Sequence, residues 1–413
     1  MSMGLALATA VGGPASAKYK VLYTFCADQQ TCADGSGPPV GLTGDYQGNF
    51  YGITSAGGAN GFGTIFKLAK AGKRFAYHVL YSFAACTQDS CPDGTAPAGE
   101  LALDTTGNLY GAMSRGAGGS VLGNLFELTA GGQYRMLYAF CSLDKCVDGR
   151  QPLSPLTYPG DNTGALYDGV SPLYGTTVAG GDWDGGLAYS FTPGADRPQT
   201  LFSFCALTQH DNCSSGEGPM GPLAVSASKT LYGATLNESG DTPGGLLWSV
   251  DPHRTLHHFC PGQPDNPCQP GAPAGPLGVA LDPDTGALYG TTITGGGGNQ
   301  GVAFSYDTST RKFSTLRSFP DGENPRSILY PDGMGGVLGV AGGGAHGGGV
   351  LYRIDLTTKK LKTLYDFCQI SEPYCADGAG PVGRVVPYSG SIFGVTAGGG
   401  GGLQPGVIYQ YTP

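Results

Sequence analysis

The chain has 413 residues, a net charge of -9 and only 13 % charged residues. Proteins that bind nucleic acid need a basic surface, so this composition excludes nucleic acid as a partner. Its 74 glycines and 30 prolines would indicate low complexity if they followed no pattern. Its 23 Tyr and 17 Phe recur at regular places, however, which predicts a packed core.

Residues 1–17 are small and apolar and end in Ala15-Ser16-Ala17, which is typical of a secretory signal and its cleavage site. The cationic start of such a signal is missing, so a disordered leader is the alternative. No other apolar run reaches the roughly 20 residues of a membrane-spanning helix, and we expect no transmembrane segment.

From residue 18 onward, four short segments rich in aromatic and β-branched residues recur seven times, about 55 residues apart. In the second unit they read "GELALD" (strand A), "NLYGAM" (B), "GNLFEL" (C) and "MLYAF" (D). Gly, Pro, Asp or Asn separates them, which indicates strands joined by turns. The predicted strand sets are 39–83, 98–140, 152–204, 221–259, 275–319, 326–367 and 382–413 plus 18–25.

This pattern predicts an all-β fold, a seven-bladed β-propeller of four-stranded antiparallel blades, as one domain over residues 18–413. The order of the strands predicts how the ring closes. The segment after the leader is a D strand without a blade, and the last A, B and C strands lack a D strand. Pairing residues 19–25 with the strand at 406–411 satisfies both. We expect the glycine after each B-strand aromatic to leave space for the neighbouring sheet.

Twelve cysteines form six close pairs, one after each D strand except the sixth. Their spacings vary too much for zinc half-sites and are too wide for a redox pair. They predict six local disulfides and an oxidising compartment. The pairs are Cys26/Cys32, Cys86/Cys91, Cys141/Cys146, Cys205/Cys213, Cys260/Cys268 and Cys368/Cys375.

The repeated "LYGTT–GG", "G–F" and "LYSF" segments resemble the GloVer tandem-repeat (choice-of-anchor) family over residues 19–413. The resemblance implies a β-propeller-like, exported protein, secreted or at the periplasm or cell surface. It implies no activity and no catalytic residues. No anchor follows the last unit, so we expect secretion rather than attachment.

In a propeller, the D–A and B–C loops lie on one face, which here carries all the cysteines and glycine runs. We call it the stapled face and expect the ligand there, because function concentrates in loops held by a rigid scaffold. Blade three alone inserts residues between A and B, on the opposite face. Asp34, Asp93, Asp148, Asp321 and Asp377 recur at one place on the stapled face. They suggest either a carboxylate ring for a cation or, as we favour, Asx turns.

Residues that break the repeat are better candidates for ligand binding. Trp183 stands between Asp182 and Asp184, which suits stacking on a sugar ring, although a Trp packed on its own blade is the alternative. For an acidic sugar, His210 or His346 could act as a base and Arg115 could neutralise a carboxylate. Asp211, beside His210, and Glu238 are further candidates. His210 and Asp211 lie inside the predicted Cys205/Cys213 loop, and His346 lies in the glycine run of blade six. Arg115 and Glu238 are predicted to lie in the B–C loops of blades two and four.

We therefore expect an exported, monomeric propeller that binds an extracellular polysaccharide or other glycan through the stapled face. A polysaccharide lyase or glycoside hydrolase at the same face is one alternative, so whether the protein is an enzyme stays open. A cell-surface scaffold for a protein partner is another. We expect no cofactor and no metal site, with a structural cation in the central channel as the exception to test.

Overall fold

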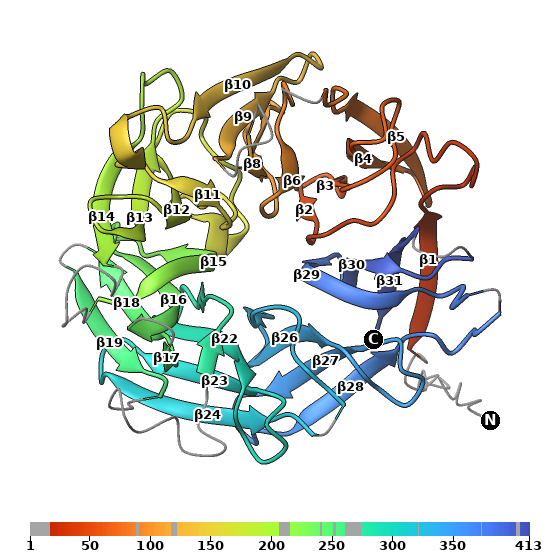
Figure 1. Ribbon diagram of the computed structural model, residues 1–413. Coiled ribbons are helices and arrows are strands. Elements are labelled where there is room, and N and C mark those ends of the chain that lie inside the picture. The colour runs from red at the N-terminus through yellow and green to blue at the C-terminus, as the bar shows by residue number, and fades with distance from the viewer. Residues whose placement is uncertain are drawn as a thin grey trace, which may run out of the picture.

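The structure is a computed structural model that describes residues 17–87, 91–116, 122–205, 215–239, 242–250, 253–260, 274–320, 322–372, 374–401 and 405–413. Within these residues, seven antiparallel sheets stand around a central axis. Figure 1 shows them as the blades of one closed ring. The predicted seven-bladed propeller is therefore confirmed. Residues 1–16, most of the predicted leader, lie outside the described residues.

In blades one to six the strands are arranged from the axis outward in chain order, so the first strand is innermost; in blade seven β29 is innermost and β1 is outermost. Blade one contains β2 (Thr43–Gly44), β3 (Phe50–Ile53), β4 (Thr64–Ala71) and β5 (Arg74–Ser82). Blade two contains β6 (Thr95–Pro97), β7 (Ala102–Leu103), β8 (Leu109–Arg115), β9 (Asn124–Leu128) and β10 (Tyr134–Ala139). Blade three contains β11 (Arg150–Pro152), β12 (Leu173–Ala179), β13 (Asp184–Phe191) and β14 (Gln199–Cys205).

The remaining blades follow the same plan. Blade four contains β15 (Glu217–Val225), β16 (Leu231–Ser239), β17 (Thr242–Pro243), β18 (Leu246–Val250) and β19 (Arg254–His258). Blade five contains β20 (Ala274–Pro276), β21 (Ala280–Leu281), β22 (Ala287–Thr294), β23 (Val302–Asp307) and β24 (Lys312–Ser318). Blade six contains β25 (Tyr330–Pro331), β26 (Gly336–Ala341), β27 (Val350–Asp355) and β28 (Leu361–Asp366). Blade seven contains β29 (Ala379–Tyr388), β30 (Ser391–Gly398), β31 (Val407–Thr412) and β1 (Lys18–Thr24).

The ring closes by antiparallel pairing of β1 with β31, as the order of the strands predicted. The pairing runs from Lys18 opposite Thr412 to Thr24 opposite Val407. The first strand of the described chain is thus the outermost strand of the last blade (Figure 1).

The glycine of each B strand makes room for an aromatic ring of its own blade, so the expectation that it accommodates the neighbouring sheet is wrong. In all seven blades this glycine pairs directly with a fully buried aromatic residue of strand C. A Cβ atom on the glycine would lie only 2.3–2.5 Å from the nearest atom of that side chain, a ring carbon of Phe or Trp or the hydroxyl oxygen of Tyr. The pairs are Gly52–Phe66, Gly111–Phe126, Gly175–Tyr189, Gly233–Trp248, Gly290–Phe304, Gly339–Tyr352 and Gly394–Tyr409.

Four of the six predicted disulfides are shown by the structure: Cys26–Cys32, Cys86–Cys91, Cys141–Cys146 and Cys368–Cys375. Cys213 and Cys268, from the other two predicted pairs, lie outside the described residues. Several disulfides in one chain indicate an oxidising, extracytoplasmic compartment. No helix in the described part of the chain is long and apolar enough to span a membrane.

The repeated aspartates bind the cysteine loops to the D strands rather than forming a ring of free carboxylates. The carboxylate of Asp93 accepts hydrogen bonds from the Tyr81 hydroxyl (2.9 Å) and the Ala84 N–H (2.7 Å). Asp34, Asp148 and Asp377 make the same kind of contacts. The favoured structural role of these aspartates is thus confirmed, but their geometry is not that of an Asx turn. The backbone N–H groups that they accept lie seven residues before Asp34, nine before Asp93, six before Asp148 and eight before Asp377. Asp321 lies outside the described residues.

Stacked rings join neighbouring blades at the outer D strands. Tyr23 stacks on Tyr77 with ring centroids 3.8 Å apart, and His257 stacks on Phe313 at 3.9 Å. At the closure, Tyr365 of blade six stacks on Tyr19 of β1 at 3.7 Å. The Tyr19 hydroxyl donates a hydrogen bond to the backbone carbonyl of Asp377. Stacked rings of the D strands thus link neighbouring blades, including the blades on either side of the β1–β31 closure.

The contact between Gly339 and Tyr352 gives a test of the B-strand glycines. Gly339→Ala should lower the free energy of unfolding by about 1–3 kcal/mol through overpacking. Tyr352→Phe should be neutral or slightly stabilising, because the Tyr352 hydroxyl has no hydrogen-bond partner among the described residues. The double variant should recover part of the loss, since the hydroxyl is the atom nearest the new Cβ. Denaturant unfolding of all three proteins measures this, and an unaltered Gly339→Ala variant would contradict the packing argument.

The His257–Phe313 stack predicts a pH-dependent stability. Burial, and secondly the neighbouring His258, lower the pKa of His257 from its ordinary 6.5 to about 4. The unfolded chain therefore binds this proton first, and the stability due to neutral His257 is lost as the pH falls from 6.5 towards 4. His257→Phe keeps the ring and removes the titration. Between pH 6.5 and 4, the melting temperature of His257→Phe should fall less than that of the native protein. An equal fall in both melting temperatures would contradict this prediction.

Candidate functional site

The stapled face forms as predicted: in the described part of the chain, three cysteine loops pack against the glycine turn between strands B and C of the next blade. The Gly58 N–H donates to the Cys32 carbonyl at 2.9 Å, and the Gly181 N–H donates to the Cys146 carbonyl at 3.0 Å. In the same way, the Gly400 N–H donates to the Cys375 carbonyl at 2.8 Å. The disulfide loops therefore support the B–C turns and hold them in place.

Trp183 lies at the surface of this face, in the turn between β12 and β13. Its side chain is 42 % exposed, whereas Trp248 is fully buried beneath strand B of its own blade. The backbone of Trp183 forms a bridge with Cys205 at the end of β14. The side chain is therefore partly buried against the protein and partly open to solvent, and a ligand-binding role for Trp183 stays a prediction.

The two aspartates beside Trp183 fix the turn. The Asp182 N–H donates to Ser203 Oγ at 2.8 Å. The Asp184 carboxylate accepts the Gly180 N–H at 2.8 Å and both its oxygens contact Arg150 Nη2, at 3.0 and 3.1 Å. Asp184 has a positive φ of 56°, which Asp tolerates better than most residues. Trp183 is thus held on a rigid support.

A groove of about 420 Å³ adjoins this turn, between the Cys141–Cys146 loop and the start of β14. Its size lies in the range of small-molecule binding sites. Its walls combine apolar, amide, hydroxyl and charged side chains. They are Leu143, Val147, Asp148, Asp182, Arg197, Pro198, Gln199 and Thr200.

The other predicted site residues do not join Trp183. Arg115 ends β8 in blade two, and His346 is exposed in the B–C turn of blade six. These blades are not neighbours in the ring (Figure 1), and no contact among the described residues joins the two side chains. Glu238 lies within β16 rather than in a loop, and its side chain is outside the described part. His210 and Asp211 lie outside the described residues.

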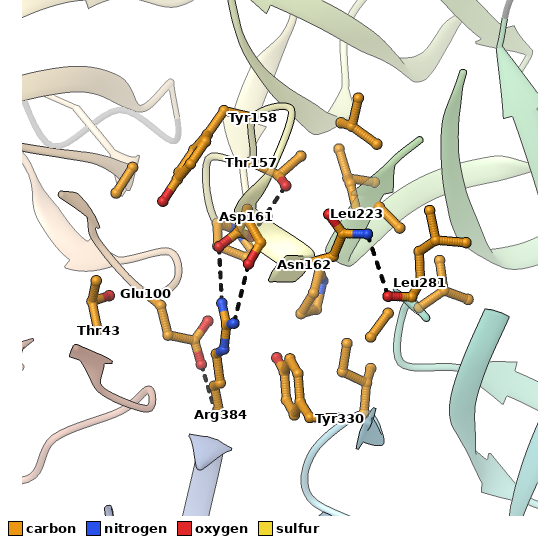
Figure 2. A pocket seen from close by; sticks show the side chains of 18 of the residues that line it. Thr43, Glu100, Thr157, Tyr158, Asp161, Asn162, Leu223, Leu281, Tyr330 and Arg384 are labelled. Carbon is orange, nitrogen blue, oxygen red and sulfur yellow. Dashed lines mark hydrogen bonds and ion pairs between the residues drawn. The ribbon is translucent and has the colours of Figure 1, made fainter. Parts of the chain in front are cut away.

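Sequence analysis missed a second site, a chamber in the central channel. Residues from all seven blades line this cavity of about 90 Å³. Figure 2 shows its charged part, where Arg384 of β29 meets Asp161, with Glu100 nearby. Arg384 Nη1 lies 2.9 Å from Asp161 Oδ1, and the guanidinium covers the ring of Tyr330 at 5.1 Å. Glu100 Oε1 accepts the backbone N–H groups of Arg384 (2.8 Å) and Gly41 (3.1 Å).

The insertion of blade three carries Asp161 into the channel. Its short 3-10 helix η2 (Asp161–Thr163) lies against blades four, five and seven. Asp161 reaches blade seven, and Asn162 Nδ2 lies 3.5 Å from the Leu281 carbonyl of blade five. Farther along, the Tyr167 N–H donates to the Leu103 carbonyl of blade two at 2.9 Å. The insertion therefore crosses the channel on the face opposite the stapled one.

The groups of the chamber serve structure rather than proton transfer. Burial, the largest single effect, would lower the pKa of Arg384, but the charge and hydrogen bond of Asp161, together with Tyr330 and Glu100, outweigh it, and the pKa lies above its ordinary value. Burial, and then the charge of Glu100, raise the pKa of Tyr330 well above 10.0. Arg384 thus stays charged and Tyr330 neutral. Nor do three His, Cys, Asp or Glu side chains gather as a metal site anywhere in the described residues.

The Arg384–Asp161 pair should contribute to stability. Its side chains are 27 % and 30 % exposed, between a surface pair and a buried one. Asp161→Ala should lower the free energy of unfolding by about 1–3 kcal/mol. Combining it with Arg384→Met should restore much of the loss, because no unpaired charge remains. Asp144→Ala, at an exposed site, is the control in denaturant unfolding; an equal effect of both alanine variants would refute the pairing.

Solved structures with a similar fold have distant sequences. An oligogalacturonate lyase in complex with manganese has a TM-score of 0.51 at 12% identity and matches 96% of both chains. YCF48 from Cyanidioschyzon merolae has a TM-score of 0.50 at 12% identity, over 96% of this chain and 99% of that one. An S511A mutant of puromycin hydrolase has a TM-score of 0.50 at 14% identity, over 88% of this chain and 51% of that one. At these identities the likeness extends to the fold alone.

A sequence-family comparison is more specific. No curated protein is significantly similar to the chain. The model of the Gloeobacter/Verrucomicrobia repeat, however, matches residues 12–171 and 270–413, most of the chain. This confirms the resemblance seen in the repeated "LYG" and "LYSF" segments, which recur on strands B and D of the propeller. The chain belongs to the Gloeobacter/Verrucomicrobia repeat family.

Proposed function

We propose that this protein is an exported propeller that binds carbohydrate through its stapled face, at Trp183 and the adjoining groove. It would act as a secreted, periplasmic or cell-surface protein. The observation that carries the proposal is the exposure of Trp183 on a turn fixed by both neighbouring aspartates. A flat indole ring with hydrogen-bonding groups beside it suits the apolar face and the hydroxyls of a sugar.

The composition of the groove supports the same ligand class. Leu143, Val147 and Pro198 offer apolar surface, and Gln199 and Thr200 offer neutral hydrogen-bonding groups. Its volume of about 420 Å³ suits a short oligosaccharide segment. The channel chamber, at about 90 Å³, falls well below the usual size of ligand pockets, and its charged groups bind one another. The groove is therefore the better candidate.

Binding is favoured over catalysis because the described residues supply no joint acid–base arrangement. A lyase acting on an acidic sugar needs a base and a neutralising cation within reach of one substrate group. Arg115 and His346 belong to blades two and six and do not meet. The fold likeness to a lyase, at 12% identity, does not alter this preference.

The proposal predicts that Trp183→Ala loses at least about tenfold in glycan affinity, which corresponds to about 1.4 kcal/mol of stacking. Trp183→Phe should keep part of the affinity, because a smaller aromatic platform remains. Met334→Ala, exposed in a turn on the opposite face, is the control and should bind normally. A glycan array identifies the ligand and calorimetry measures the affinities.

Other outcomes would point elsewhere. A native protein that binds no glycan on the array would refute the proposal. Release of reducing ends, or absorbance from an unsaturated product, would indicate a hydrolase or lyase instead.

A further inference from the structure

The charged residues of the groove beside the Trp183 turn indicate the class of ligand more closely than the volume of the groove does. Two carboxylates, Asp148 and Asp182, line the groove, against one guanidinium, Arg197. The other nearby arginine, Arg150, is already bound to Asp184 through both carboxylate oxygens. The lining therefore has a net negative charge, in a chain whose total charge is -9.

The two lining carboxylates differ in their availability. Asp148 is buried, and its oxygens accept hydrogen bonds from Tyr138, Ser142 and Leu143. Asp182 is exposed, and within the described residues its carboxylate takes part in no hydrogen bond or ion pair. Only its backbone N–H is engaged, with Ser203. Asp182 thus leaves an exposed carboxylate in the same rigid turn as Trp183, one residue before it.

An indole face next to a carboxylate favours a cation. The π-system of Trp attracts ammonium groups more strongly than that of Phe or Tyr, and a nearby carboxylate adds Coulomb attraction. An anionic ligand would face two carboxylates for a single guanidinium. A neutral ligand would leave the Asp182 charge without compensation. Asp144 and Lys145, in the loop beyond the groove, offset each other and do not change this balance.

We propose that the ligand is an amino sugar, bound as a protonated amine with its ring on Trp183 and its ammonium group at Asp182. This inference rests on the proposed carbohydrate-binding function and names the ligand class for the same site. A basic peptide is the competing occupant. The sugar is favoured because the rigid turn offers one flat platform and one carboxylate, which matches a single ring with one amine.

The test is calorimetry on the whole protein with four probes in mildly acidic, low-salt buffer. The probes are a free-amine amino-sugar oligomer, the fully N-acetylated oligomer of equal length, an oligo-uronate and an oligolysine. We expect the free-amine oligomer to bind at least about fivefold more tightly than the other three, with an advantage that shrinks as salt is added.

Charge variants separate the contributions. Asp182→Asn should weaken binding of the free-amine oligomer by about three- to fivefold and leave the N-acetylated oligomer unchanged. Arg197→Ala should tighten the free-amine oligomer about twofold, whereas an anionic ligand would lose affinity with this variant. Asp144→Asn, outside the groove, is the matched control and should behave as the native protein does.

The outcomes distinguish carbohydrate binding itself from the preference for a protonated amine. Equal, Trp183-dependent binding of free-amine and N-acetylated oligomers would overturn the amine inference and leave carbohydrate binding standing. If the protein prefers the oligo-uronate and Arg197→Ala weakens that binding, the ligand is an acidic sugar and the amine inference is wrong. Equal or tighter binding of oligolysine would assign the site to basic peptides. If no sugar binds, the proposed function and this inference both fail.

Discussion

The antiparallel pairing of β1 with β31 is the constraint on which the rest of the molecule depends. It joins the two ends of the repeat array and leaves no blade with an incomplete sheet. Tyr19 strengthens the same seam by stacking on Tyr365 and bonding to Asp377. A second tie lies at the axis, where Glu100 of blade two accepts N–H groups from blades one and seven. The ring is thus fastened at its rim and at its centre.

A closed ring gives the loops of the stapled face fixed positions, and this is what makes a binding site of separate segments possible. The groove draws on the Cys141–Cys146 loop, the B–C turn of blade three and the start of β14. None of these segments is regular structure for its full length. Each is held by groups that belong to the scaffold, including the Asp148 carboxylate and the Arg150–Asp184 pair.

The repeats allowed the fold to be predicted, since strand identity, blade number and ring closure all follow from the order of four recurring segments. Trp183 could be chosen as a candidate because it interrupts that recurrence, and its ligand-binding role stays a prediction. The channel cluster was missed because it needs the seven A strands aligned by their pairing, which places Gly41, Glu100, Pro155, Pro222, Gly278, Ile328 and Arg384 at one level. Glu100 and Arg384 are the only charged residues at this level, and Asp161 joins them from the blade-three insertion. The groove could not be predicted, since its walls meet only through packing.

The closure also has a consequence for biogenesis. Tyr19 and Asp377 are 358 positions apart in the chain, so β1 has no partner strand until the final blade of the ring has been made. Its edge remains open to strand pairing with other chains throughout that interval. Export of an unfinished or unfolded chain would prolong this exposure. Lys18 and Lys20, at the start of β1, place positive charges on that waiting edge, a feature that discourages association between strands of separate molecules.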